Sequence, residues 1–190
     1  KSNVQDKVEI ANKLIAQLSS SYPEYDLDSK IIDTKGEALM EVRDERINTK
    51  NLERPESSLV TSKLFSGDNG DKLKDEFRKE IVSADSIDML VSFIKVSGIA
   101  LIRDKLNEFA NKGGKLRVVC TTYTGATDAN AVKEISELPN AEVKISYDTK
   151  HTRLHAKAYM FRRKSGFDTA YIGSSNLSNA AISNGREWNL

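Results

Sequence analysis

The sequence has few of the residues that would cross-link a protein covalently or carry it through a membrane. Cys120 is the one cysteine among 190 residues, which excludes an internal disulfide framework and favours a reducing compartment. No apolar run approaches the roughly 20 residues that a membrane-spanning helix needs, and the first residues do not resemble a signal peptide. These absences predict a cytoplasmic protein that does not act in a membrane.

The sequence also lacks an excess of charge of either sign. The net charge is +1, with 38% hydrophobic and 30% charged residues, so the field of the whole chain does not indicate nucleic acid. The cations are unevenly placed, however. Residues 149–167 contain no acidic residue but two histidines and six cations, namely Lys150, Arg153, Lys157, Arg162, Arg163 and Lys164. This segment is either a solvated hairpin tip or a phosphate-binding region.

The most informative stretch runs from residue 154 to residue 176. Apolar residues alternate with polar ones at its start, so His155 and Lys157 project from the same face of a strand. Residues 164–166 predict a turn, and residues 169–172 predict a second strand. In such a hairpin, residue 155 lies opposite about 174 and residue 157 opposite about 172. The two side chains are therefore expected beside the run Gly173-Ser174-Ser175-Asn176.

This arrangement would gather a nucleophile, a fixed cation, a hydroxyl and a carboxamide around one point. Residues 177–182 are typical of the first turns of a helix, and a Gly-Ser-Ser-Asn turn before a helix exposes backbone N–H groups suited to a phosphate. The chemistry that fits is phosphoryl transfer. The imidazole of His155 can attack phosphorus, while Lys157 and Asn176 hold the non-bridging oxygens.

The pattern is similar to the signature of the phospholipase D superfamily, usually written HxKx4Dx6GSxN. The matching residues are His155, Lys157, Gly173, Ser174 and Asn176. Glu187 stands where members that resemble bacterial phospholipase D-type nucleases carry an acidic residue that orients the catalytic histidine. A lone His-X-Lys on a strand is usually only a polar face, and the downstream matches are what favour a functional interpretation.

Two features depart from the signature. Arg162 occupies the position of the motif aspartate, and the gap from Lys157 to Gly173 is four residues longer than the pattern. An insertion at the hairpin tip would explain the longer gap. Asp168, five residues before Gly173, is a weak candidate to replace the motif aspartate.

Strands and helices alternate along residues 55–190. This predicts an α/β fold, a mostly parallel mixed sheet with helices on both faces and an appended antiparallel hairpin. Residues 1–54 are expected to form an N-terminal extension, with a helix from Asn3 to Leu18 and an irregular part after it. Trp188 is expected in the core rather than as a stacking platform, and Tyr159 and Tyr171 are expected to pack at cross-strand positions.

The resemblance covers residues 55–190 and extends to phospholipase D-like domains that precede bacterial superfamily 2 (DEAD/DEAH-box) helicases. The runs that carry it are SADSIDMLVSFI, GGKLRVVCTTYTG, HAKAYMF, AYIGSSNLS and REWN. It implies that the chain is a fragment of a longer protein with a C-terminal helicase. No Walker A pattern occurs in these residues.

The resemblance implies a hydrolase, a metal-independent DNA endonuclease with a phosphohistidine intermediate and no cofactor. His155 is the nucleophile, Lys157, Asn176 and Ser174 stabilise the phosphoryl group, and Glu187 positions the His155 ring. Further phosphate contacts are expected from Gly173, Ser175, Arg153 and Arg162. Because one chain carries one motif, two chains are expected to pool their motifs in a symmetric homodimer.

Three alternatives stay open. One is an inactive nucleic-acid-binding module that guides the helicase, which Arg162 slightly favours. Another is a lipid phosphodiesterase, which the lack of an amphipathic membrane-binding helix disfavours. The third is a zinc site at His151 and His155, which lacks the cysteine or clustered carboxylates that would complete it.

Overall fold

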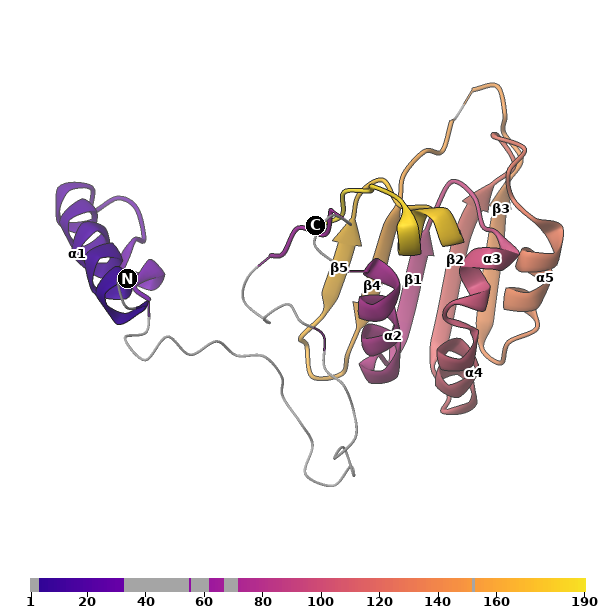
Figure 1. The fold of residues 1–190 in the computed structure, drawn as a ribbon, viewed down its shortest axis with the longest axis horizontal. Helices are drawn as coiled ribbons and strands as arrows, with labels where there is room; N and C mark the ends of the chain where they lie inside the picture. The colour runs from indigo at the N-terminus through magenta and orange to yellow at the C-terminus, as the bar shows by residue number, and fades with distance from the viewer. Residues whose placement is uncertain (1–3, 33–54, 56–61, 67–71, 152) are drawn as a thin grey trace. The chain divides into compact units, whose positions relative to one another are not determined.

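The computed structural model describes residues 4–32, 55, 62–66, 72–151 and 153–190 (Figure 1). The chain forms two compact units, Lys1–Leu39 and Met40–Leu190. The expected boundary at residue 54 adjoins residues outside the described ranges and stays a prediction, as does the irregular segment expected before it.

The N-terminal unit contains the predicted helix, α1 (Val4–Ser21), followed by a short 3₁₀ turn, η1 (Asp28–Lys30). Two side chains of α1 hold the segment that follows it. Asn12 exchanges hydrogen bonds of 2.7 and 2.8 Å with the backbone of Ile32, and the Ser19 hydroxyl donates to Asp28 at 2.7 Å. These contacts fold residues 22–32 back along the helix.

The second unit is built on a five-stranded sheet in the order β3-β2-β1-β4-β5. Three strands run parallel: β1 (Ser86–Leu90), β2 (Lys115–Thr121) and β3 (Ala141–Ser146). The hairpin strands β4 (Ala158–Arg162) and β5 (Thr169–Ile172) are antiparallel to each other, and β4 is antiparallel to β1. The predicted α/β fold with a mixed sheet and an appended hairpin is confirmed.

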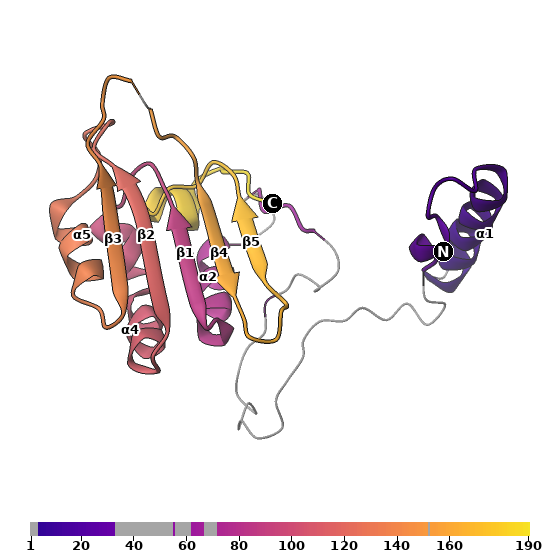
Figure 2. The ribbon, with the colours of Figure 1, turned by 180° about the vertical axis from the view of Figure 1, so that it is seen from behind.

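The helices of this unit lie on one face of the sheet, as the opposite views of Figures 1 and 2 show. They are α2 (Leu73–Ser83), α3 (Val96–Ala100), α4 (Arg103–Asn111), α5 (Ala129–Ser136) and the π-helical turn η2 (Ala180–Asn184). The expectation of helices on both faces is therefore wrong for the described residues. We call the face without helices the open face. Burial follows this division, because residues alternate between buried and accessible along β1 and β4.

An aromatic cluster lies between α2 and the hairpin. Phe77 of α2 is fully buried, and its ring centroid is 4.5 Å from that of Tyr159, 5.6 Å from Phe161 and 5.3 Å from Tyr171. Tyr159 and Tyr171 are direct cross-strand partners, as predicted. This contact anchors the hairpin to the helix layer, so the strand that carries the motif has a rigid base.

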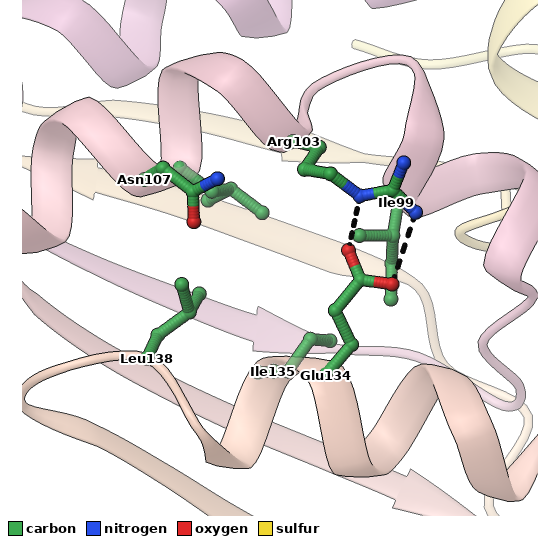
Figure 3. A pocket seen from close by; sticks show the side chains of 7 residues that line it. Ile99, Arg103, Asn107, Glu134, Ile135 and Leu138 are labelled. Atoms are coloured by element: carbon green, nitrogen blue, oxygen red, sulfur yellow. Dashed lines mark hydrogen bonds and ion pairs between the residues drawn. The ribbon is translucent and has the colours of Figure 1, made fainter.

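A second contact between helices is polar. Arg103 of α4 and Glu134 of α5 pair through both carboxylate oxygens, at 2.5 and 3.0 Å, above a shallow pocket between the helices (Figure 3). Ile99, Leu106, Asn107, Ile135 and Leu138 complete its lining. None of the sequence-predicted site residues lines this pocket, so it is part of the helix packing rather than of the candidate site.

A buried ion pair secures the tip of the hairpin. Glu80 of α2 is fully buried, and its carboxylate accepts hydrogen bonds from Arg163 and, at 2.8 Å, from the Tyr171 hydroxyl. The Arg163 guanidinium also donates to the Phe167 carbonyl and the Thr169 hydroxyl, each at 2.9 Å. One buried carboxylate thus ties both strands of the hairpin to α2.

Replacing Glu80 with alanine should destabilise the protein strongly, because the largely buried Arg163 guanidinium loses the carboxylate with which it pairs. We expect a loss of about 3–5 kcal/mol in the free energy of unfolding, measured by urea denaturation. Glu134→Ala removes one partner of a more exposed ion pair and should cost about 1 kcal/mol or less. Equal losses in the two variants would show that the buried pair has no special role.

Candidate active site

Most of the predicted site residues lie at one edge of the sheet, and Arg162 does not. The parallel strands β1, β2 and β3 end at this edge, and the antiparallel strand β4 begins there. The segment after β5 leaves the sheet at the same place. We call this the carboxyl edge, the usual location of ligand sites in α/β sheets. His155, Lys157 and the Gly-Ser-Ser-Asn run all lie at it.

The hairpin is present, but its register differs from the prediction by one residue. Ala158 pairs with Ile172, and the Gly173 N–H donates to the Lys157 carbonyl at 3.1 Å. Continuing this register places residue 157 opposite 173 and residue 155 opposite 175, rather than opposite 172 and 174. The expected outcome still holds, because His155 and Lys157 lie beside residues 173–176.

His155 and Lys157 are in direct contact. The Lys157 ammonium is 2.9 Å from Nδ1 and 3.1 Å from Nε2 of His155, and it donates to the His155 carbonyl at 2.7 Å. The imidazole is exposed, whereas only 6% of Lys157 is accessible. An imidazole that solvent can reach is therefore backed by a cation held within the protein.

Burial has a consequence for the charge of Lys157. Desolvation lowers the pKa of its ammonium below the ordinary value, and the negative charge of Glu187 partly opposes this by raising the pKa. The Glu187 carboxylate also helps burial to raise the pKa of Tyr159. In this structure Glu187 acts on Lys157, and no hydrogen bond joins it to His155 among the described residues. Its predicted role in orienting the histidine stays a prediction.

Asn176 is oriented by the end of β1. Its Oδ1 accepts hydrogen bonds from the backbone N–H groups of Ser92 at 3.0 Å and of Phe93 at 3.1 Å. Two donors on one atom identify that atom as the oxygen, so the amide NH₂ is the group available to a ligand. Asn176 is 8% exposed. The structure therefore supplies a pre-oriented donor at the carboxyl edge, and its contact with a phosphate stays a prediction.

The backbone of the Gly-Ser-Ser run is used within the protein. The Gly173 N–H binds Lys157, the Ser174 N–H donates to the Trp188 carbonyl at 3.0 Å, and the Ser175 N–H donates to Asn189 at 3.4 Å. The expectation that these N–H groups bind phosphate is wrong, because they already have partners. Gly173 is required for close packing instead, since a Cβ there would lie 2.0 Å from the Trp188 carbonyl oxygen.

The two serines of the run differ in their environment. Ser174 is exposed, and its hydroxyl accepts the Trp188 N–H at 3.0 Å, so it lies beside Trp188. Ser175 is fully buried, and its hydroxyl donates to the Ala181 carbonyl at 3.3 Å. The structure does not bring Ser175 to the surface as a phosphate contact. It is part of the support beneath the site.

Asn189 was not predicted from the sequence. Its side chain is 2% exposed and donates to the Ser175 hydroxyl at 2.8 Å, while the Tyr159 hydroxyl donates to the Ser175 carbonyl at 2.9 Å. Together these groups hold the run from below. No residue type or spacing marks Asn189 in the sequence, because its role depends on a strand pairing between residues 173 and 189.

Arg162 and the longer hairpin loop, the two departures from the signature, lie far from His155. Arg162 is at the far end of β4, five residues from Lys157 and so about 16 Å away at about 3.3 Å per residue. There it pairs with Asp88 at 3.2 Å. Asp168 lies in the hairpin loop and accepts the Arg163 N–H at 2.8 Å. The longer gap is thus an enlarged hairpin tip, as expected, and neither residue can contact a ligand at His155.

Arg153 and Trp188 are exposed at the carboxyl edge. Arg153 is exposed, and its guanidinium lies 5.9 Å from the centroid of the Tyr123 ring. Trp188 is 67% exposed, so the expectation that it packs in the core is wrong. Its backbone pairs with Ser174, and this pairing places it on the surface beside the site.

Comparison with known proteins identifies the family. A family model described as the PLD-like domain of cardiolipin synthase matches residues 77–190, more than half of the chain. The chain belongs to the phospholipase D-like family. No curated protein matches the chain.

Among solved structures, NucT from Helicobacter pylori matches this phospholipase D-like chain with a TM-score of 0.51 at 16% identity, over 67% of this chain and 81% of that one. This likeness supports the fold. TrmBL2, titled an archaeal chromatin protein with a novel mode of DNA binding, aligns at a TM-score of 0.37 and 11% identity, over 98% of this chain and 58% of that one. That similarity is too low to carry an argument.

Two further observations concern the described residues of the phospholipase D-like chain. No group of three or more His, Cys, Asp or Glu side chains is arranged to hold a metal ion in this part of the chain. None of the helices that the structure describes combines the length and apolar character of a membrane span.

Lys157 provides a test of the site that does not depend on the substrate. Because the folded pKa is lowered, the unfolded chain binds more protons between the folded pKa and about 10.5, and the stability rises with pH in that interval. Lys157→Met removes the desolvation cost. At pH 7 it should leave the free energy of unfolding unchanged or raise it by roughly 1 kcal/mol, while function is lost.

Urea denaturation of the wild type and of Lys157→Met at pH 7 and at pH 10 measures this difference. The advantage of the methionine variant should shrink at the higher pH, where the wild-type amine loses its charge. An advantage that grows with pH would contradict the assignment of Lys157 as a desolvated cation.

Proposed function

We propose that this domain is a phosphodiesterase that cleaves nucleic acid, with DNA as the expected substrate, through a covalent phosphohistidine. The observation that carries the proposal is the contact between the buried Lys157 ammonium and the exposed His155 imidazole at the carboxyl edge. Membership of the phospholipase D-like family and the fold shared with NucT support it.

The reaction has two steps. In the first, an imidazole nitrogen of His155 forms a bond to phosphorus while the bond to the leaving oxygen breaks, and that oxygen takes a proton from a general acid. In the second, water attacks phosphorus, gives its proton to the conjugate base of the general acid, and the P–N bond breaks, so the second product leaves and both the imidazole and the general acid are restored. Lys157 and the Asn176 amide donate to the non-bridging oxygens in both steps. A hydrogen bond from Ser174 stays a prediction, because its hydroxyl accepts the Trp188 N–H on the other face of the sheet.

The positions of Lys157 and Asn176 suit this chemistry. Lys157 and Asn176 are held by buried contacts, so they need little rearrangement when charge develops on the phosphoryl oxygens. Glu187 maintains the charge of Lys157 by raising its pKa against desolvation. The Lys157 ammonium therefore stabilises the negative charge of the phosphate. We propose that the reaction needs no metal for this purpose.

The general acid requires a second histidine. His151 is the other histidine of the chain, but it is 88% exposed and lies 3.5 Å from Asp148. We therefore favour His155 of a second copy, supplied by a symmetric homodimer that brings two motifs together. The mass of the protein in solution tests this part of the proposal, and a monomer with full activity would contradict it.

An inactive nucleic-acid-binding module loses its main support. It was favoured by Arg162 at the position of the motif aspartate, and that residue is paired with Asp88 at the opposite end of β4 from His155. Attachment to a helicase, and a role in restriction or repair in the cytoplasm, follow from the sequence resemblance alone and stay predictions.

Cleavage of plasmid and single-stranded DNA in EDTA tests the proposed function. His155→Ala should reduce the rate by at least about 10³-fold, because it removes the nucleophile. His151→Ala is the matched control and should cleave like the wild type, because that exposed imidazole has no part in the site.

Cleavage that survives in His155→Ala would refute the assignment of the nucleophile. DNA binding by the wild type without cleavage, over a range of pH and salt, would leave a binding module. Activity that appears only when zinc is added would refute the metal-independent mechanism.

A further inference from the structure

Trp188 is the most unusual residue near the site. It is the only tryptophan of the chain, and 67% of it is exposed, although tryptophans are mostly buried in folded proteins. Its backbone is firmly held, since its carbonyl accepts the Ser174 N–H at 3.0 Å and its N–H donates to the Ser174 hydroxyl at 3.0 Å. A large aromatic ring is thus presented to solvent from a rigid position.

We propose that Trp188 stacks on an unpaired base of the substrate and that the substrate is single-stranded nucleic acid. This inference rests on the proposed phosphodiesterase function and names the substrate class of the same site. An indole stacks on any base, and such contacts contribute about 1–3 kcal/mol per base. The bases of a duplex are already stacked on one another, so an exposed ring selects for strands whose bases are free.

The position of the ring relative to the phosphate site follows from the pairing. Residues 174 and 188 are directly opposite each other, so their side chains lie on the same face, with Cα atoms about 5.5 Å apart. Ile172 and Leu190, the next pair along, are also exposed on this face, at 65% and 56%. It is the open face, because Tyr171, the residue before Ile172, points into the core.

Glu187, the preceding residue, points the other way, toward Lys157. Glu187 and the indole therefore lie on the two sides of the carboxyl edge, one residue apart along the same segment. A strand that crosses the edge with one phosphate at His155 places an adjacent base on Trp188.

A second aromatic group lies further along the same edge. The Arg153 guanidinium is 5.9 Å from the Tyr123 ring, and Tyr147, the residue after β3, is 72% exposed. Aromatic rings with an interposed arginine are typical of surfaces that bind single strands, where cations follow the backbone and rings stack on bases. The carboxyl edge therefore has aromatic rings on both sides of His155, with Trp188 on one side and Tyr123 and Tyr147 on the other.

The charge of the open face argues against a protein partner as the reason for the exposed indole. On this face Asp88 of β1 lies beside Arg117 of β2 and pairs with it at 2.6 Å, and Arg162, further along β4, pairs with Asp88 at 3.2 Å. The apolar part continues from Ile172 and Leu190 to Met160 and Ala170 and is then bordered by these charges, so it is smaller than the core of a stable interface. A strip of this size suits a single polynucleotide strand.

The fluorescence of Trp188 provides a direct test, because no other tryptophan contributes to the signal. The protein for the titrations carries His155→Ala, so that bound strands are not cleaved. The probes are a single-stranded oligodeoxynucleotide, an abasic strand of the same length, the matching duplex, and vesicles of anionic phospholipid. We expect quenching by the base-containing strand and little change with the abasic strand or the duplex.

Substitutions test the same contact by affinity. Trp188→Ala should weaken binding of the single strand about 5- to 150-fold at constant salt, and leave binding of the abasic strand unchanged. Trp188→Phe keeps a ring and should retain most of the affinity. In protein with intact His155, Trp188→Ala should raise KM for single-stranded DNA and change kcat little, because the ring does not touch the reacting phosphate.

Three outcomes would overturn the inference: equal quenching by the abasic strand, unchanged affinity of Trp188→Ala for the single strand, or a blue shift of the fluorescence with vesicles alone. The two proposals can fail separately. Cleavage that depends on His155 without quenching refutes only the stacking role. Quenching by the single strand without cleavage in the wild type refutes the phosphodiesterase and leaves a single-strand-binding module.

Discussion

The site depends on one close approach of three strand segments at Gly173. The Gly173 N–H binds the Lys157 carbonyl on one side, and a Cβ at this position would lie 2.0 Å from the Trp188 carbonyl oxygen on the other. Only glycine permits both contacts. The segment that holds Lys157 and the segment that holds Glu187 and Trp188 are thereby fixed to the same residue. A larger residue would separate the ammonium from the carboxylate that sustains its charge.

The functional side chains are oriented by groups that never meet the ligand. Ser175 and Asn189 form a buried pair beneath the run, and Asn176 takes its orientation from two N–H groups at the end of β1. Such support from rigid elements lets a site meet a substrate without first reorganising. It also explains why the chain tolerates a desolvated cation, since the surrounding contacts compensate for a charge that is unfavourable in itself.

The signature motif separates into two parts with different physical roles. The candidate catalytic residues lie at one end of the hairpin, and the hairpin tip carries an anchor in which Glu80 and Arg163 pair beside the aromatic cluster. Arg162 and the additional loop residues belong to the second part, at the amino ends of the parallel strands. Variation in length or charge at the tip can therefore occur without moving His155. Departure from a linear motif is thus a poor guide to activity when the motif spans both ends of a strand.

Local pattern determined the helices, the strands, the hairpin and the group of residues from His155 to Asn176, because period and turn chemistry are properties of adjacent residues. Only the tertiary structure decided the rest. The register of the hairpin differed by one residue. Ser175 was expected at the surface and is buried, whereas Trp188 was expected in the core and is exposed. The role of Asn189 had no signal in the sequence. Each of these depends on the pairing of residues 172–174 with 188–190, a short contact between segments with no regular alternation. Burial of a side chain is decided by which segment packs beside it, and a sequence does not state that contact.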